Sequence, residues 1–304
     1  MSELQVVSIV GPTAAGKTAL SLELAKRFDA EIVNLDAYQI YRGMDIGTAK
    51  PSVDERAGIP HHLIDVVDIE FNASVADFQS WAHTAIADIN SRGRLAICVG
   101  GSGLYVRAVL DELDIPATDP AVRQKYNDLL EEHGAEWLHQ MLADRDSTAA
   151  SLILPGNSRR VVRALEVIEL TGAPFRAEMP EPNSMFSDVR IGVAAGRTDI
   201  ADRIRRRTSV MWEQGWPAEV SALDAAGLPA TPTASRALGY REVSQFNAGE
   251  ISAESAQTLI ADATIKFSKR QMQWFNRDKK VAWLPFDAPD IAELATSIVA
   301  TARR

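Results

Sequence analysis

Residues 11–18 read Gly-Pro-Thr-Ala-Ala-Gly-Lys-Thr and directly follow the apolar run Val6–Val10. The two glycines of this segment allow a tight turn in which successive backbone N–H groups point into one concavity. Lys17 adds a positive charge for the outer phosphates, and the Thr18 hydroxyl can hold Mg²⁺. The helix expected from Ala19 to Phe28 adds its N-terminal dipole. The segment, called the phosphate loop below, predicts a cradle for a di- or triphosphate, formed by Gly11, Thr13, Ala14, Ala15, Gly16, Lys17 and Thr18.

Composition narrows the class of protein that carries this cradle. The chain has 304 residues, 46% of them hydrophobic, which is enough for two domains or for one domain with an insertion. It has no apolar stretch of 18 residues for a membrane span, and it begins with a predicted strand rather than a signal peptide. Its single cysteine, Cys98, lies in the apolar run Leu95–Val99 and is expected to be a buried thiol. We therefore expect a cytosolic enzyme.

The formal net charge of −9 argues against a nucleic-acid partner when taken alone. Basic residues nevertheless gather in three places, at 203–207, 159–163 and 266–280. One such cluster is usually a solvated helix face. Three clusters in an acidic chain favour a localised surface that binds anions.

Strand and helix patterns alternate over the first 113 residues, which predicts an α/β fold with a parallel sheet. The expected strands are Gln5–Val10, Glu31–Leu35, His62–Val66 and Leu95–Val99. The expected helices are Lys17–Phe28, Val75–Ser91 and Gly103–Leu110. Residues 114–180 instead show only helical periodicity, at Ala121–His133, Glu136–Ala143, Ser147–Leu152 and Ser158–Thr171.

A linker rich in proline follows at 179–184, and the alternating pattern then returns. It predicts a strand at Val189–Ala194 and helices at Arg203–Gln214, Pro217–Ala226 and Ala253–Arg277. The predicted fold is a parallel-sheet α/β core like that of P-loop NTPases, formed by residues 1–113 and 187–304. A helical insertion domain at 114–186 interrupts it.

The residues at the carboxyl ends of two predicted strands differ from those of an ordinary P-loop ATPase. Such an enzyme usually carries an acid for Mg²⁺ at a second strand end, but Leu95–Val99 ends in Gly100-Gly101-Ser102. The nearest carboxylate at a strand end is Asp36, which a parallel sheet would place at the crevice of the phosphate loop. Asp36 is also readable as a turn former or as a kinase base. The glycines allow close backbone approach to a ligand, or form a plain loop.

Several segments together resemble the tRNA dimethylallyltransferases. They are Gly11–Thr18, Asp36–Tyr41, Met44–Pro51, Pro60–Asp65, Gly100–Tyr105, Arg159–Glu166, Gly239–Glu242, and Lys269–Gln271 with Trp274. The resemblance covers nearly the whole chain. The phosphate loop is shared by many functions, whereas the block Met-Asp-Ile-Gly-Thr-Ala-Lys-Pro at 44–51 is highly specific. Three positions depart from the family pattern. Those at 37 and 265 suggest retuned substrate contacts around an intact core chemistry, and the one at 102 keeps the hydroxyl. Ala37 replaces Ser, Ser102 replaces Thr, and Ile265 stands where a basic residue is common.

The resemblance implies transfer of a dimethylallyl group from dimethylallyl pyrophosphate to the N6 amine of an adenine. That adenine is 3′-adjacent to the anticodon in tRNA. The loop would then hold a leaving group, with Mg²⁺ on Thr18 and with Arg207, or Arg203 one turn earlier, absorbing its charge. Asp36 is the expected general base, and Ser102 is expected to orient the amine or to donate to the bridging oxygen.

The same resemblance implies the contacts with tRNA. A base of the anticodon loop would leave its stack to reach the cavity, while arginines bind phosphates. The expected tRNA-binding residues are Asp36, Ala37, Tyr38, Gln39, Ser102, Arg123, Arg159, Arg160, Val161, Val162, Arg163, Ser235, Arg236 and Gly239. Gln39 is expected to read a neighbouring base. The insertion is expected to close over the anticodon stem-loop from the side opposite the core, in a monomeric enzyme.

Three alternatives remain open from the sequence. An adenylate isopentenyltransferase would use the same chemistry on free AMP or ADP, and the insertion and arginine clusters weigh against it. A small-molecule P-loop kinase explains the loop and Asp36 but leaves the 44–51 block unexplained. A non-enzymatic nucleic-acid-binding module does not need an intact phosphate loop.

Overall fold

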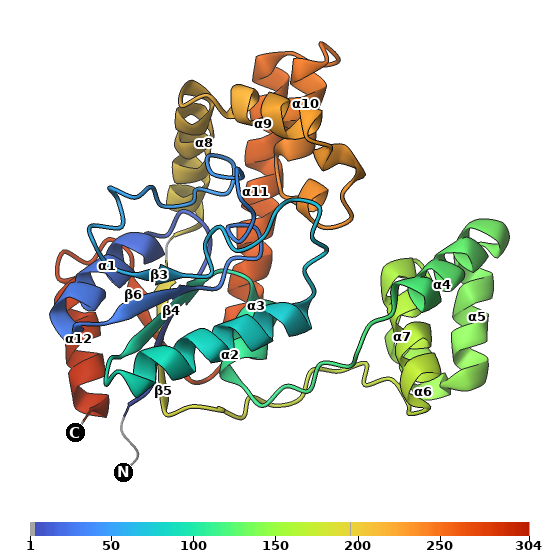
Figure 1. The fold of residues 1–304 in the computed structure, drawn as a ribbon, viewed down its shortest axis with the longest axis horizontal. Coiled ribbons are helices and arrows are strands. Elements are labelled where there is room, and N and C mark those ends of the chain that lie inside the picture. Colours follow the sequence, from blue (N-terminus) through green and yellow to red (C-terminus); the bar gives the residue numbers. More distant parts are fainter. Residues whose placement is uncertain (1–3, 195, 304) are drawn as a thin grey trace. The chain divides into compact units, whose positions relative to one another are not determined.

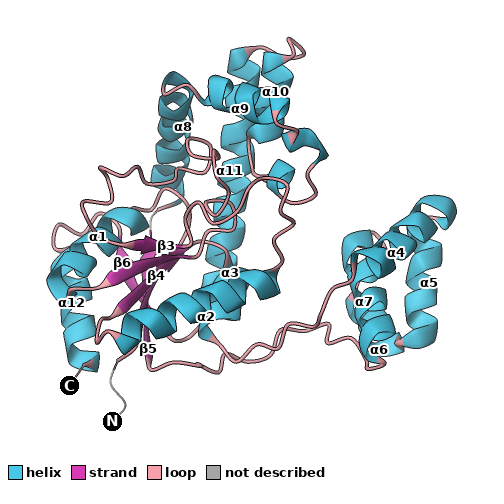
Figure 2. Cartoon of the chain, in the orientation of Figure 1, coloured by secondary structure: helices cyan, strands magenta, loops and turns pink. Residues whose placement is uncertain are grey.

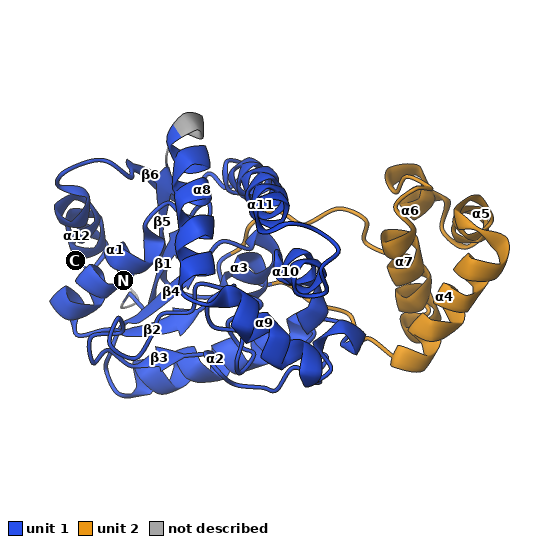
Figure 3. Cartoon of the chain, turned by 90° about the horizontal axis from the view of Figure 1, so that it is seen from above, with its two compact units in different colours: residues 1–112, 184–304 blue, residues 113–183 orange. Residues whose placement is uncertain are grey.

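The computed structural model describes residues 4–194 and 196–303. The chain divides into two compact units, one formed by residues 1–112 and 184–304 and the other by residues 113–183 (Figure 3). The predicted insertion at 114–186 overlaps the second unit. Each unit is described by itself below.

Unit 1 is built on a parallel sheet (Figure 2), whose described strands have the order β3-β2-β4-β1-β5-β6. Its strands are β1 (Val6–Val10), β2 (Glu31–Asn34), β3 (His61–His62), β4 (Ala96–Gly100), β5 (Asp188–Ala194) and β6 (Val281–Pro285). The central strand β1 pairs with β4 so that Val10 lies opposite Gly100. This register brings the phosphate loop after β1 beside the glycine-rich loop after β4, at the carboxyl edge where ligands bind in such sheets.

Helices cover both faces of this sheet (Figure 1). The α-helices described in unit 1 are α1 (Lys17–Phe28), α2 (Val75–Ser91), α3 (Gly103–Leu110), α8 (Arg197–Glu213), α9 (Trp216–Ala225), α10 (Tyr240–Asn247), α11 (Ala253–Phe275) and α12 (Ile291–Ala302). One apolar core joins Phe78 and Ile86 of α2 to the sheet, and a second joins Leu24 of α1 to Val299 of α12. All five residues of β1 are buried, as expected for a parallel strand covered on both faces.

Several predicted boundaries in unit 1 are wrong, for local reasons. The strand predicted at His62–Val66 ends at His62, because Leu63 and Asp65 have φ of +60° and +55° and turn the chain. Helix α8 begins at Arg197, six residues before its predicted start. The sequence prediction missed α10, β6 and α12. Strand β6 is a half-exposed edge strand without a clear apolar alternation.

Unit 2 is a helical bundle of α4 (Pro120–His133), α5 (Ala135–Arg145), α6 (Ser147–Leu152) and α7 (Ser158–Thr171). Tyr126, Leu138 and Leu165 meet in its apolar core. Asp119 caps α4 by accepting hydrogen bonds from the backbone N–H groups of the first turn, and Pro120 occupies the first helical position. Gly172 ends α7 in the left-handed conformation that favours glycine.

The carboxylate of Glu166 on α7 is fully buried in unit 2. It accepts hydrogen bonds from the Thr118 hydroxyl (2.6 Å), the backbone N–H of Asp119 (3.0 Å), Arg123 (2.8 Å) and Arg163 (2.7 Å). Burial raises the pKa of Glu166, but the hydrogen bonds outweigh it and leave the pKa below its usual range. Arg123 and Arg163, which the sequence analysis predicts to bind tRNA, therefore form ion pairs with a buried carboxylate.

Replacing Glu166 by Ala is expected to destabilise unit 2 by about 1.5–3 kcal/mol, because the charged hydrogen bonds to Arg123 and Arg163 are lost while water can reach both arginines. The loss should be full at neutral pH. It should shrink below about pH 4.3, since a group with a lowered folded-state pKa stabilises the fold only above its unfolded pKa. Thermal unfolding followed by circular dichroism measures both effects. Glu131→Ala, at an exposed position of α4, is the matched control, and equal melting temperatures for the two variants would contradict the assignment.

Candidate active site

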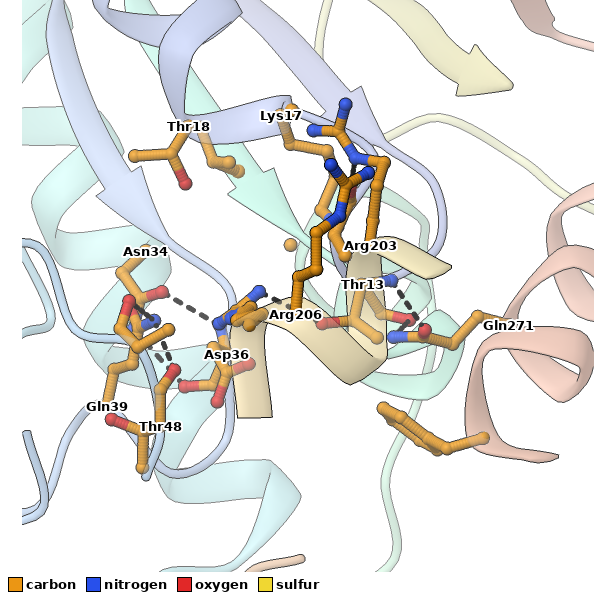
Figure 4. A pocket seen from close by; sticks show the side chains of 18 residues that line it. Thr13, Lys17, Thr18, Asn34, Asp36, Gln39, Thr48, Arg203, Arg206 and Gln271 are labelled. Atoms are coloured by element: carbon orange, nitrogen blue, oxygen red, sulfur yellow. Dashed lines mark hydrogen bonds between the residues drawn. The ribbon is translucent and has the colours of Figure 1, made fainter. Parts of the chain in front are cut away.

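A cavity of about 520 Å³ opens at the carboxyl edge of the sheet in unit 1 (Figure 4). The loops after β1, β2 and β4 form its wall together with helices α8 and α11. Of the residues predicted from sequence, it brings together Thr13, Ala14, Gly16, Lys17, Thr18, Asp36, Gln39, Arg203 and Arg207. The sequence prediction missed Asn34, Thr48, Ala49, Arg206, Phe267 and Gln271 as residues of this wall.

The phosphate loop requires glycine at both of its fixed positions. Gly11 has φ of +139°, and a Cβ atom there would lie 2.6 Å from the Val193 carbonyl oxygen on the neighbouring strand. Gly16 has φ of +92° and directly precedes α1. The cavity wall therefore includes the N-terminus of α1, which favours a bound anion.

Two cationic side chains bind carbonyl oxygens of the same loop. Lys17 Nζ donates to the Pro12 carbonyl (2.7 Å), and Arg203 Nε donates to the Ala14 carbonyl (2.7 Å). These bonds place both positive charges at the rim of the loop, and neither cation forms an ion pair with a carboxylate among the described residues. A pyrophosphate in the cradle would complete their electrostatic environment.

Burial, and to a lesser extent the charge of Arg207, lower the pKa of Lys17 to about 8 against the opposing effect of Asp36. Burial likewise lowers the pKa of Arg207. Arg207 Nη1 lies 3.4 Å from the Thr13 hydroxyl oxygen, which places its guanidinium against the phosphate loop. Arg206 adds another cation to the wall. The cavity is thus suited to an anion of high charge.

Asp36 is the acidic residue among these cations. Burial raises its pKa, while the backbone N–H of Tyr38 (2.9 Å to Oδ1) and the charge of Lys17 oppose that rise. The bond from Tyr38 makes Asp36 a turn former as well as a residue of the cavity wall. A carboxylate whose pKa is raised by burial is better suited to accept a proton near neutral pH.

Gln39 is fixed by the block at 44–51. Its side-chain nitrogen donates to the carbonyls of Thr48 (3.1 Å) and Ala49 (3.2 Å), and both of these residues line the cavity. The carboxylate of Glu219 on α9 in turn accepts the backbone N–H groups of residues 45, 46 and 47 (3.0, 2.6 and 3.2 Å). The block therefore builds the wall of the cavity opposite the phosphate loop.

The buried amine of Lys50 forms ion pairs with two more exposed carboxylates, one inside this block and one outside it. Lys50 Nζ lies 2.6 Å from an Asp45 carboxylate oxygen and 2.5 Å from one of Asp65. Gly47 leaves no room for a Cβ atom beside the Trp216 and Tyr240 rings. These contacts explain why a segment without a catalytic side chain has so specific a sequence.

Ser102 lies at the N-terminus of α3, and only its neighbours Gly100 and Gly101 belong to the described cavity wall. Its predicted role at the amine or the bridging oxygen stays a prediction. Ile265, one of the departures from the family pattern, packs beside the core of α1 and α12 rather than in the cavity wall described for this chain.

Apart from Ser102, the predicted tRNA-binding residues fall into three groups. The segment 36–39, with half-buried Ala37, meets the segment 235–239 through the Tyr38 hydroxyl, which donates to the Arg236 carbonyl (3.2 Å). Ser235 and Arg236 lie in a short 3-10 turn, and Gly239 precedes α10. In unit 2, Val161 and Val162 are buried, and Arg160 donates to the Ala177 carbonyl. Arg159 is an exposed member of that group.

Oxygen donors near the loop suit Mg²⁺. Thr18 and Asp36 both line the cavity, and hydroxyl and carboxyl oxygens are ligands that this ion accepts. Within residues 4–194 and 196–303, no group of three His, Cys, Asp or Glu side chains is arranged to hold a metal ion. A magnesium ion here would therefore depend on phosphate oxygens of a bound ligand. None of the described helices is long and apolar enough to cross a membrane.

Comparisons with known proteins show the family to which this chain is similar. Residues 39–278 match the family model of IPP transferases. The chain is 50% identical to the tRNA dimethylallyltransferase of Thermobifida fusca over 299 residues, covering 97% of this chain and 94% of the relative. It is 52% identical to that of Salinispora arenicola over 279 residues, covering 92% of this chain and 82% of the relative.

Solved structures with the same fold include a transferase and an enzyme acting on tRNA. The full-length tRNA isopentenylpyrophosphate transferase of Bacillus halodurans is 37% identical, with a TM-score of 0.72 over 99% of this chain and 98% of that one. A eukaryotic dimethylallyltransferase acting on tRNA is 24% identical and shares the fold. Its TM-score is 0.83 over 96% of this chain and 77% of that one.

The lowered pKa of Lys17 predicts how the cavity binds inorganic pyrophosphate at different pH. Affinity should fall by about tenfold between about pH 7 and about pH 9, because the amine loses its proton and a charged hydrogen bond disappears. Isothermal titration calorimetry measures this change. Lys17→Arg keeps its charge throughout, so its slope reports only the titration of pyrophosphate itself. Parallel slopes for the two proteins would contradict the prediction.

Proposed function

Because this chain belongs to the tRNA dimethylallyltransferase family, we propose that its cavity transfers a dimethylallyl group from dimethylallyl pyrophosphate to the N6 amine of an adenine in tRNA. The chain is a prenyl-transferring enzyme. The observation that supports the site is the joint presence of the phosphate loop, Arg207 and Asp36 in one cavity wall. The products would be N6-isopentenyladenosine in the tRNA and free pyrophosphate.

The phosphate loop would bind the leaving group. Breaking the allylic C–O bond leaves its electron pair on the pyrophosphate oxygen, so negative charge grows where Lys17 and Arg207 lie. Preorganised cations and backbone N–H groups at such a place lower the barrier more than they tighten ground-state binding. Mg²⁺ held by Thr18 would neutralise part of the same charge when it is bound.

Asp36 would act on the nucleophile. The adenine amine is a weak nucleophile because its lone pair is delocalised into the ring. As its nitrogen bonds to the allylic carbon, one N6 proton moves to the Asp36 carboxylate and the C–O electron pair leaves with pyrophosphate. The raised pKa of Asp36 favours this transfer near neutral pH.

The acceptor would be the adenine on the 3′ side of the anticodon, within the anticodon stem-loop. Support comes from Gln39 at the cavity and from exposed Arg159 in unit 2. The relatives at about 50% identity are named for action on tRNA, which does not favour free AMP as the acceptor or phosphorylation of a small molecule as the reaction.

The buried free thiol of Cys98 suits a reducing compartment, and we propose a monomer that works in the cytoplasm.

Replacing Asp36 by Asn should lower turnover by about 10²–10⁴-fold, because the amide cannot take the N6 proton. The affinity for inorganic pyrophosphate should change little, since Lys17 and Arg207 remain. The assay follows transfer of label from dimethylallyl pyrophosphate to tRNA, with the modified nucleoside identified by mass spectrometry.

Asp54→Asn, at an exposed position outside the cavity, is the matched control for that loss. Turnover of Asp36→Asn close to wild type would remove Asp36 as the base. AMP serves as a second acceptor in the same assay, and equal labelling of AMP and tRNA would contradict the proposed substrate.

Arg159→Ala should weaken tRNA binding and reduce the salt dependence of its logarithmic affinity by about one unit of slope, because one phosphate contact is lost. Arg159 is a sharper probe than Arg163, whose loss would also disturb Glu166. Binding is measured by fluorescence anisotropy at several salt concentrations. Lys26→Ala, an exposed residue of α1, controls for total charge. An unchanged slope for Arg159→Ala would exclude the contact.

A further inference from the structure

The side chain of Gln271 on α11 connects the two loops that border the cavity. Its oxygen accepts the backbone N–H of Thr13 (2.9 Å), and its nitrogen donates to the Gly101 carbonyl (2.9 Å). Gln271 is 6% exposed, so these bonds form largely away from water. Figure 4 shows the amide beside Thr13 at the cavity wall.

The glycine-rich loop is shaped to receive this amide. A Cβ atom on Gly101 would overlap the Gln271 side-chain nitrogen, and a Cβ atom on Gly103 would overlap the Trp274 ring. Gln271 and Trp274 are three residues apart and lie on one face of α11. That face of α11 therefore rests directly on the loop that carries Ser102.

Gln271 also reaches the cationic side of the cavity indirectly. Thr13, whose N–H it binds, lies with its hydroxyl 3.4 Å from Arg207. Neither Lys17 nor Arg207 is bonded to Gln271 itself in the contacts of the described residues. The amide thus influences where the phosphate loop lies without supplying any of its charge.

We propose that Gln271 is a positioning residue that sets the separation between the pyrophosphate cradle and the loop of Gly101 and Ser102. The proposal rests on the proposed transfer reaction. Its reacting carbon and nitrogen must lie about 3–3.5 Å apart, and a misplacement of about 1 Å costs about 10²-fold in rate. Because the cradle holds the donor, a change in the separation of the loops lowers kcat more than it weakens binding.

The test is a double-mutant cycle of Gln271→Ala and Gly101→Ala. Each single variant should lower kcat at saturating donor and tRNA by about 10–100-fold, while the Kd for inorganic pyrophosphate changes by less than about threefold. The double variant should be no more than about threefold slower than the slower single variant. Alanine at 271 removes the overlap of the new methyl group with the Gln271 side-chain nitrogen and leaves only the milder 3.3 Å approach to the Gly11 carbonyl oxygen, so the two effects act largely on one contact.

Gln273→Ala, an exposed glutamine of the same helix, is the matched control and should leave kcat unchanged. Circular dichroism establishes that each variant is folded. If Gln271→Ala does not fold, Gln271→Met takes its place because it retains the length of the side chain, and the kcat and Kd results are read in the same way.

Multiplicative losses in the double variant, or an unchanged kcat in Gln271→Ala, would overturn the proposal. A pyrophosphate Kd that rises in parallel with the loss of kcat would overturn it too, since Gln271 would then serve binding alone. Failure of the proposed function itself is distinguishable, because the wild-type protein would then bind pyrophosphate but transfer no label to tRNA.

Discussion

Mutual repulsion among cations in one cavity is the constraint on which the rest of the site depends. Lys17, Arg203, Arg206 and Arg207 line the same wall, and burial and the neighbouring charge of Arg207 together lower the pKa of Lys17 to about 8. These four cations repel one another, so hydrogen bonds and a nearby carboxylate must hold them together. Carbonyl oxygens of Pro12 and Ala14 accept from two of these cations, and Asp36 offsets their field. The phosphate loop is therefore a preorganised electrostatic site.

The wall formed by residues 44–51 is held rigid mainly by hydrogen bonds to its backbone. The block at 44–51 contributes backbone carbonyls that fix Gln39, and it is itself held by Glu219 and by the buried Lys50. A polar segment at a cavity wall needs its backbone groups satisfied, or it would relax into the space meant for a substrate. Positioning by backbone hydrogen bonds thus explains the sequence of the block better than direct chemistry does.

The sequence predicts those parts of the site that depend on a short run of neighbouring residues. The phosphate loop has a fixed spacing of glycines, and Asp36 ends a short apolar strand, so both were predicted to lie at the carboxyl edge of a parallel sheet. Gln271 was not found as part of the wall, because its role depends on how α11 packs against loops 170 residues or more away. Arg206 is one of several arginines in the run 203–207, and only the orientation of α8 shows that it lines the cavity. Strand β6 and helix α12 were missed because an edge strand and its following helix carry a weak apolar pattern.

The number of basic residues in the sequence also overstates how many cationic side chains of unit 2 can bind an anion. Arg123 and Arg163 bind the buried Glu166, and Lys125 binds Glu169 at 2.8 Å, so much of the local positive charge is matched by carboxylates. An ion pair inside a helical bundle orients side chains but contributes little field at a distance. Phosphate contacts by this unit must then depend on cations that form no ion pair among the residues the structure describes, and exposed Arg159 on α7 is one of them. A chain of net charge −9 is thereby compatible with tRNA binding, because affinity depends on where a few exposed cations lie and not on their sum.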